Sequence, residues 1–183
     1  MNLAAFLPQA KNYINTLTPD QVSFWCPNQP FSISPLAQGE YNMNYLVQQG
    51  DNQPWVFRVN VGSQIHREDQ IEYEFKALQL LEASQRTPSP LFVDDSREKL
   101  NHGVLGMVYL PGKPIQYESH MIEAARLFAD IHEFTHTLQD THLIKEEKPL
   151  SMTYDECASL MPKYLESDLA DENIVSYLKE VLS

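Results

Sequence analysis

The sequence predicts an α+β fold, in which an antiparallel sheet of five strands with one packed helix is followed by a region made only of helices. Three observations support this prediction. Between Phe31 and Leu110, short β-favouring runs alternate with turn residues. Within that region, one segment repeats its apolar residues at the helical period instead. After Pro114 every apolar pattern has the helical period, and no strand pattern returns.

The composition disfavours several classes of partner. The formal net charge of −12 argues against nucleic acids and anionic membranes, which bind to basic surfaces. Cys26 and Cys157 are too few for a disulfide framework, so we expect a reduced, cytoplasmic protein. Residues 1–17 have neither a cationic start nor an apolar run long enough to cross a bilayer. We therefore expect no nucleic-acid partner and no membrane partner.

The first elements of the chain are a helix and a meander of strands. Residues 1–17, a stretch that Pro8 interrupts, predict a short helix at the surface. Turn residues at Gly39 to Asn42 and at Gly50 to Asn52 then separate three β-favouring runs. The expected antiparallel strands are residues 31–38, 43–49 and 54–60.

A single amphipathic helix is expected next. The segment 67–83 places Ile71, Phe75 and Leu78 at helical spacing, with Glu and Lys residues on the other face. Pro88 follows and cannot continue a helix. The helix therefore has one apolar face that can pack on the sheet.

Two further strands and a linker complete the predicted first lobe. The strands are expected at residues 91–95 and 103–110, joined by a polar turn. Two prolines and a glycine in residues 111–114 then break the chain. The resulting division is an N-terminal lobe at 1–110, a linker at 111–114 and a helical C-terminal lobe at 115–183. Helices are expected in that last lobe at residues 119–138, 153–166 and 170–183.

The run PLAQGEYNMNYLV resembles the nucleotide-covering hairpin of the aminoglycoside phosphotransferase and choline kinase family, which has the protein-kinase-like fold. Gly39 and Asn42 match the Gly and Asn of that hairpin, and Tyr41 lies between them. A glycine at a hairpin tip lets backbone N–H groups approach phosphate oxygens, because no Cβ intervenes. The resemblance implies that these three residues contact a nucleotide.

WVFRVN and IEYEFKALQLL resemble the third strand and the following helix of the same family. Arg58 matches the basic residue that reaches the nucleotide phosphates, and Glu74 matches the carboxylate that pairs with it; Glu72 is the near alternative. In isolation such residues more often form an ordinary surface ion pair. Their order and spacing behind the hairpin favour the nucleotide role.

GVLGMVYLPGKPI resembles the segment that joins the two lobes in this family. The resemblance implies that Met107 lines the adenine pocket, while the Val108 carbonyl and the Leu110 amide bind the adenine edge; plain core packing is compatible with the same Met107. AARLFADIHEF resembles the helix that opens the large lobe. The resemblance covers residues 33 to 134 and implies a kinase-like small lobe followed by an incomplete helical large lobe.

The catalytic motifs of the family do not occur in this sequence. Its members use a His-x-Asp loop, an Asn and a later Asp to act on the acceptor hydroxyl and to bind Mg²⁺. None of the six histidines is followed by Asp two positions later. We therefore expect the ATP-binding half of a small-molecule kinase, with ATP and Mg²⁺ as the family cofactors and no activity on its own. The acceptor stays open among aminoglycoside, choline, homoserine, fructosamine and methylthioribose.

Two alternative interpretations use the same residues. His132-Glu133-Phe134-Thr135-His136 is a literal H-E-x-x-H, and His142 falls at the third-ligand spacing of a longer zinc-peptidase motif. Gln139 stands where that motif needs a Gly, and ordinary helix-surface histidines explain the pattern equally well. The second alternative is a non-catalytic lobe that binds a nucleotide or a protein partner. Exposed apolar helices would then favour self-association.

Overall fold

The structure is a computed structural model that describes residues 2–63, 65, 67–145 and 147–181, and it describes the backbone alone at Thr135. His66 therefore lies outside the described residues. The chain divides into two compact units, Met1–Leu143 and Ile144–Ser183. Each unit is described by itself below.

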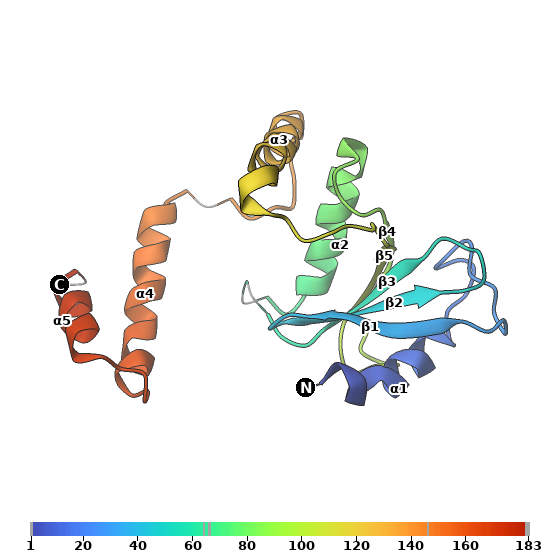
Figure 1. Ribbon diagram of the computed structural model, residues 1–183, viewed down its shortest axis with the longest axis horizontal. Helices are drawn as coiled ribbons and strands as arrows, with labels where there is room; N and C mark the ends of the chain where they lie inside the picture. Colours follow the sequence, from blue (N-terminus) through green and yellow to red (C-terminus); the bar gives the residue numbers. More distant parts are fainter. Residues whose placement is uncertain (1, 64, 66, 146, 182–183) are drawn as a thin grey trace. The chain divides into compact units, whose positions relative to one another are not determined.

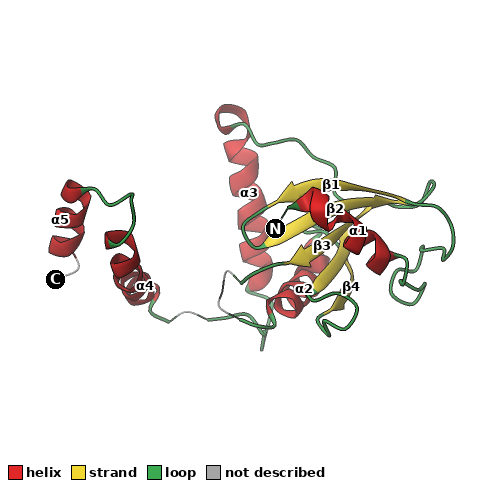
Figure 2. Ribbon diagram, turned by 90° about the horizontal axis from the view of Figure 1, so that it is seen from below, coloured by secondary structure: helices red, strands yellow, loops and turns green. Residues whose placement is uncertain are grey.

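The first unit is built on one antiparallel sheet of five strands in the order β1-β2-β3-β5-β4, drawn in Figure 1 and as a single yellow layer in Figure 2. All neighbouring strands are antiparallel, so the predicted α+β class and strand number are confirmed. The strands are β1 (Ser32–Gln38), β2 (Asn42–Gln48), β3 (Trp55–Asn60), β4 (Pro90–Asp94) and β5 (Val104–Val108).

Both edges of this sheet are irregular. The register of β1 against β2 shifts between Pro35 and Ala37. The register of β4 against β5 shifts between Pro90 and Phe92. A proline has no N–H to donate, and a register shift leaves one residue without a partner in the ladder. Neither edge strand therefore presents an uninterrupted row of hydrogen-bonding groups.

Helix α1 (Leu3–Ile14) covers one face of the sheet: the expected N-terminal helix is present, but one of its sides is buried instead of lying at the surface. The helix runs through Pro8, which lies on its exposed side. Its opposite side places four residues at helical spacing, because positions four and seven or eight residues apart share one face. These residues are buried in the core: Phe6, Ala10, Tyr13 and Ile14.

The main core lies between α1 and the sheet. Alternate residues of β2 and β3 point into it, as expected for strands with one face on a core. The polar residue Gln49 closes this core at its edge, where its side-chain amide exchanges hydrogen bonds of 2.8 and 2.9 Å with the backbone of Cys26. The central members of the core are Met43, Tyr45, Val47, Trp55, Phe57, Val59, Phe92 and Val104.

Helix α2 (Gln70–Leu81) covers the opposite face and continues into a short 3₁₀ turn, η1 (Glu82–Ser84). It contacts β4 and β5, and Ile71 in its first turn is fully buried. Helix α3 (Tyr117–Thr135) follows the linker and belongs to the same unit. Its Asp130 pairs with Arg86 at 2.6 Å.

The second unit consists of two helices, α4 (Pro149–Leu165) and α5 (Glu172–Val181). Helix α4 begins four residues earlier than its apolar pattern indicated, because Pro149 occupies the first helical turn, where a missing N–H costs nothing. The Asp171 carboxylate caps α5 by accepting hydrogen bonds from the amides of Asn173 and Ile174. No helix within the described part of the chain is long and apolar enough to span a bilayer.

Candidate functional site

The predicted pair of Arg58 and Glu74 is present in the structure. Arg58 lies on β3, and its Nη1 donates to Glu74 Oε2 on α2 at 2.8 Å. Both side chains are half-buried, with 27% and 23% exposure, so water screens the pair only partly. Glu72, the alternative partner, instead pairs with Lys76 on the exposed side of α2 at 3.3 Å. The carboxylate chosen from the sequence is therefore the one that faces the strand.

Two further residues hold this pair, and the sequence analysis missed both. Asn44 Oδ1 accepts a 2.9 Å hydrogen bond from Arg58 Nε, and Gln70 Nε2 donates to Glu74 Oε1 at 3.0 Å. Gln70 had a signal in the sequence, whereas the contact of Asn44 depends on the strand register. Asn44 is the residue opposite Arg58 once the β2–β3 register is known, and Gln70 precedes Glu74 by one helical turn. The polar set thus joins β2, β3 and α2.

The register of the sheet places the predicted strand residues on one face. Arg58 and Val56 are two residues apart on β3 and so point to the same side. Val56 is directly opposite Met107 on β5 and Leu46 on β2, and residues directly opposite share a face. An apolar row of Leu46, Val56 and Met107 therefore runs beside the polar row of Asn44 and Arg58. Val56 and Met107 are almost fully buried, at 5% and 7% exposure.

The hairpin between β1 and β2 is tied to the end of β3. Gly39 N donates to the Asn42 carbonyl at 2.9 Å and closes the turn. The Tyr41 carbonyl accepts from Val61 N at 2.8 Å, and Asn42 Oδ1 accepts from Asn60 Nδ2 at 3.2 Å. A Cβ at Gly39 would meet only the Asn42 carbonyl oxygen, at 4.0 Å. The backbone at Gly39 is therefore open to approach, and the tip lies close to the strand end that carries Arg58.

The segment after β5 leaves the sheet with its backbone partly free. Val108 N donates to the Ser89 carbonyl at 2.9 Å, and Tyr109 N donates to the Pro54 carbonyl at 3.0 Å. The next amide, that of Leu110, has no hydrogen-bond partner within the described part of the chain. Leu110 is also 54% exposed. An unpaired donor thus lies at the end of the apolar row.

A polar cavity of about 280 Å³ lies beyond the end of β3, and none of the predicted site residues lines it. Its walls are the loop that follows β3 and the loop that precedes β5. Arg67 in one wall is paired with Asp69, and Arg97 in the other is paired with Asp95. Burial, together with the nearby Arg97 charge, lowers the pKa of His102, although a backbone hydrogen bond with Asn60 opposes this shift.

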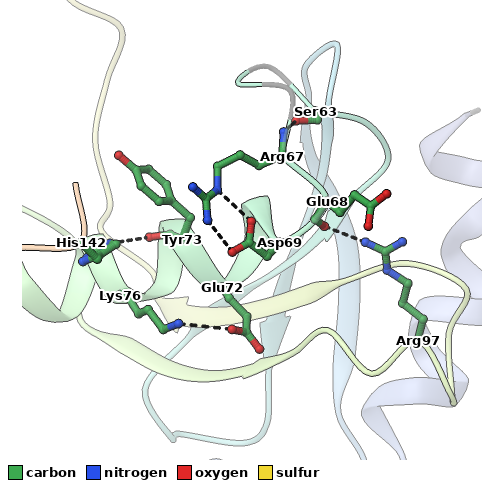
Figure 3. A network of polar contacts seen from close by, with 9 residues as sticks. All are labelled: Ser63, Arg67, Glu68, Asp69, Glu72, Tyr73, Lys76, Arg97 and His142. Atoms are coloured by element: carbon green, nitrogen blue, oxygen red, sulfur yellow. Dashed lines mark hydrogen bonds and ion pairs between the residues drawn. The ribbon is translucent and has the colours of Figure 1, made fainter. Parts of the chain in front are cut away.

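The three candidate zinc ligands do not meet. His142 lies against α2, where its Nε2 contacts the Tyr73 carbonyl oxygen at 3.2 Å (Figure 3). Its ring also packs edge-on against the Tyr73 ring, with 5.1 Å between centroids. His132 and His136 lie at the C-terminal end of α3. Among the residues that the structure describes, no three His, Cys, Asp or Glu side chains are grouped as metal ligands.

The charged residues around the start of α2 make their contacts on the exposed side of the helix. Arg67 forms a two-pronged pair with Asp69 at 2.8 and 2.6 Å, and it lies 5.5 Å from the centre of the Tyr73 ring. Arg97 Nη2 donates to the Glu68 carbonyl at 2.8 Å (Figure 3). These charges are satisfied locally on the exposed side. Glu74 instead lies on the side of α2 that faces the sheet, where it pairs with Arg58.

A five-stranded antiparallel sheet, with a strand cation paired to the carboxylate of a packed helix, defines the small lobe of the protein-kinase-like fold. Residues 32–173 match the family model of the phosphotransferase enzyme family, APH. This match covers more than half of the chain, and the chain belongs to that family. Among curated proteins, none matches significantly.

A solved structure agrees with this assignment at the level of the fold. The crystal structure of a "putative aminoglycoside phosphotransferase" from Ralstonia eutropha JMP134 superposes on 86% of this chain, with a TM-score of 0.65 and 12% sequence identity. The match covers 49% of that protein's chain, so the present chain spans about half the length of the structure it matches. At this identity the likeness shows the common fold alone.

Proposed function

We propose that this chain supplies the ATP-binding half of a small-molecule phosphotransferase. The observation that carries the proposal is the shared face of the sheet, where the Arg58–Glu74 pair adjoins the apolar row that ends at Leu110. A nucleotide has the matching pattern of a flat apolar base at one end and phosphates at the other. Membership of the phosphotransferase family supports the same role.

The described residues fit a nucleotide in three ways. In the row of Leu46, Val56 and Met107, the partly exposed Leu46 would contact the base, with the nearly buried Val56 and Met107 packed beside it. The Leu110 amide offers an unpaired donor for the edge of the base, with the Val108 carbonyl as the expected acceptor. The Arg58 guanidinium offers charge-assisted hydrogen bonds to phosphate oxygens. Gly39, Tyr41 and Asn42 at the hairpin tip would cover the phosphates.

The fit to Mg²⁺ is different. Mg²⁺ prefers carboxylate oxygens, and the described residues contain no grouped set of three acidic or histidine side chains. We therefore assign no metal ligand among the described residues, and no catalytic base is assigned because no His-x-Asp motif occurs in the sequence. In the family both functions come from the His-x-Asp loop and a later Asp, so phosphotransfer would need a segment of that kind. The acceptor would be a metabolite or antibiotic hydroxyl whose identity stays open.

The functional division of the chain also stays a proposal. We place the nucleotide lobe at 1–110, the interlobe linker at 111–114 and the helical lobe at 115–183. The compact units divide later, after Leu143, because α3 contacts α2 and η1. A reduced, cytoplasmic setting agrees with both cysteines being free.

A direct test is calorimetric titration of the purified chain with ATP. We expect saturable binding that Arg58→Ala weakens by about tenfold or more, because removal of a charge-assisted hydrogen bond costs about 1.5–3 kcal/mol. Arg67→Ala is the matched control, since Arg67 is paired on the exposed side of α2 and should leave binding unchanged. Equal weakening by both variants, or no binding by the unmodified chain, would contradict the proposal.

We also propose that the chain self-associates through its helices. Apolar side chains on α3 are strongly exposed, including Tyr117 at 80%, Ile122 at 65% and Phe128 at 60%. Large exposed apolar patches mark interaction surfaces. Static light scattering should therefore give a mass that rises with concentration, and a constant monomer mass would contradict this expectation.

A further inference from the structure

The Arg58 guanidinium is anchored at two of its three nitrogens by residues from different elements. Asn44 on β2 accepts from Nε at 2.9 Å, and Glu74 on α2 accepts from Nη1 at 2.8 Å. The third nitrogen, Nη2, has no partner within the described part of the chain. A guanidinium is planar and rigid, so two fixed nitrogens determine the direction of the third. The structure thus contains one oriented and available edge of Arg58.

Asn44 is itself held in place. Its Nδ2 donates to the Ala37 carbonyl at 3.3 Å, which turns the Oδ1 atom toward Arg58. Ala37 stands opposite Asn44 because the register of β1 shifts between Pro35 and Ala37. A bulge of this kind re-aims the groups beside it. The bulge in β1 therefore supplies the carbonyl that fixes the Asn44 amide.

Glu74, the second residue that holds Arg58, is also fixed by a neighbouring side chain. Glu74 uses Oε2 for Arg58 and Oε1 for the Gln70 amide, so both of its oxygens are engaged. Gln70 is 4% exposed and cannot swing freely. Because Glu74 is braced by Gln70, it can hold the charge of Arg58 without Asn44. The separate role left for Asn44 is to hold the direction of the guanidinium.

We propose that Asn44 is a positioning residue that aims Nη2 of Arg58 at the phosphate chain of the nucleotide. The inference rests on the proposed function and adds to it a residue with a defined effect. Asn44 acts through Arg58, so its removal should weaken the grip on phosphates and leave the base contacts intact. ATP and adenosine share the base and sugar, and they differ in the phosphates that Arg58 would bind.

The test compares the affinities of ATP and adenosine by calorimetry in the full chain and in two variants. Asn44→Ala removes the acceptor, and Asn44→Val removes it while keeping a side chain that favours strands. Because Asn44 acts only through Arg58, we expect both variants to bind ATP about 5- to 10-fold more weakly, which is less than the loss of about tenfold or more expected when Arg58 itself is removed. Their affinity for adenosine should stay within about twofold of the unmodified value.

A double-mutant cycle separates positioning from a general structural effect. Lysine at position 58 has one nitrogen and lacks the Nε that Asn44 holds. In an Arg58→Lys background, Asn44→Ala should therefore change ATP affinity by less than about twofold. Melting temperatures without ligand show whether the variants stay folded, and the Asn44→Val variant replaces Asn44→Ala if the latter melts early.

The outcomes discriminate between this inference and the proposed function. If the unmodified chain binds neither ATP nor adenosine, the proposed function is wrong and the role of Asn44 falls with it. If the unmodified chain binds both ligands but the folded Asn44 variants lose ATP and adenosine affinity equally, or lose neither, only the inference is overturned. A persistent Asn44 effect in the Arg58→Lys background would also overturn it.

Discussion

Arg58 shows how an arginine can occupy a position that kinases often give to a lysine. A lysine needs one carboxylate to aim its single nitrogen, whereas a guanidinium offers several donors and must be fixed in plane as well as in distance. Asn44 and Glu74 supply two acceptors on different sides of Arg58. The cation and its ion-pair partner could be predicted from the sequence, because their types and order carry the signal. Asn44 could not, since its contact depends on the strand register.

Gly106 is required by the packing of the core. A Cβ at this position would overlap the ring of Phe92, which is 6% exposed and has no room to move. We expect Gly106→Ala to lower the free energy of unfolding by about 1–3 kcal/mol, the usual cost of overpacking. Urea denaturation measures this change. Gly112→Ala is the control, because a Cβ there meets no atom within 4 Å and should alter stability by less than about 0.5 kcal/mol.

At the scale of elements, the bounds of the strands could be predicted from the sequence, whereas the burial of α1 and the start of α4 could not. The five strands appear within a residue or two of their predicted bounds, because alternation and turn residues are local signals. The burial of α1 was missed because the packing of its stripe through Ala10 and Ile14 on the sheet is not a local signal; this packing also outweighs the hydrogen bond lost at Pro8. The early start of α4 was missed because Pro149 was not considered as a first helical residue.

Helix α1 is fastened to the far edge of the sheet by one polar contact. The Tyr13 hydroxyl donates to Asp94 Oδ2 at 2.6 Å. Burial and this hydrogen bond raise the pKa of Tyr13. Burial alone would raise the pKa of Asp94, but hydrogen bonds from Tyr13 and Ser96 lower it overall. The folded state therefore favours the ionised form of Asp94.

Tyr13→Phe should destabilise the protein in a pH-dependent manner. We expect a loss of about 1–3 kcal/mol at neutral pH, because the hydrogen bond to a carboxylate disappears. The folded pKa of Asp94 is lowered, so its contribution is present above the unfolded pKa of about 3.9 and disappears as the pH falls through the folded value. The difference in the free energy of unfolding between the unmodified protein and Tyr13→Phe, measured by urea denaturation, should become smaller in acid. A constant gap across pH would contradict this account.

At the scale of the whole molecule, burial is distributed unevenly along the chain. The core residues lie in α1, the sheet and the loops beside them, and no described residue of α4 or α5 is buried. The sequence indicated both helices correctly, since their apolar periodicity is local. Exposed apolar helices were also an expectation from the sequence, and the absence of buried residues in α4 and α5 agrees with it. Local stability follows burial, so the two units should open independently.

Hydrogen exchange of the intact chain tests this difference. We expect amides of α4 and α5 to exchange within seconds to minutes, while those of β2 and β3 remain protected for hours, because central strands open only with global unfolding. Mass spectrometry of peptic fragments measures both. Equal protection of the two units would show that contacts of α4 and α5 stabilise them as strongly as the sheet.

The irregular margins of the sheet have a consequence for solubility. Fibrils grow when the outermost strand of one chain adds to that of another through a continuous ladder. Pro35 and Pro90 each interrupt such a ladder, and the displaced registers beside them break it again. Concentrated or partly unfolded chains should accordingly aggregate through the apolar surfaces of their helices. The aggregates should be amorphous and should have little of the cross-β order that dyes such as thioflavin detect.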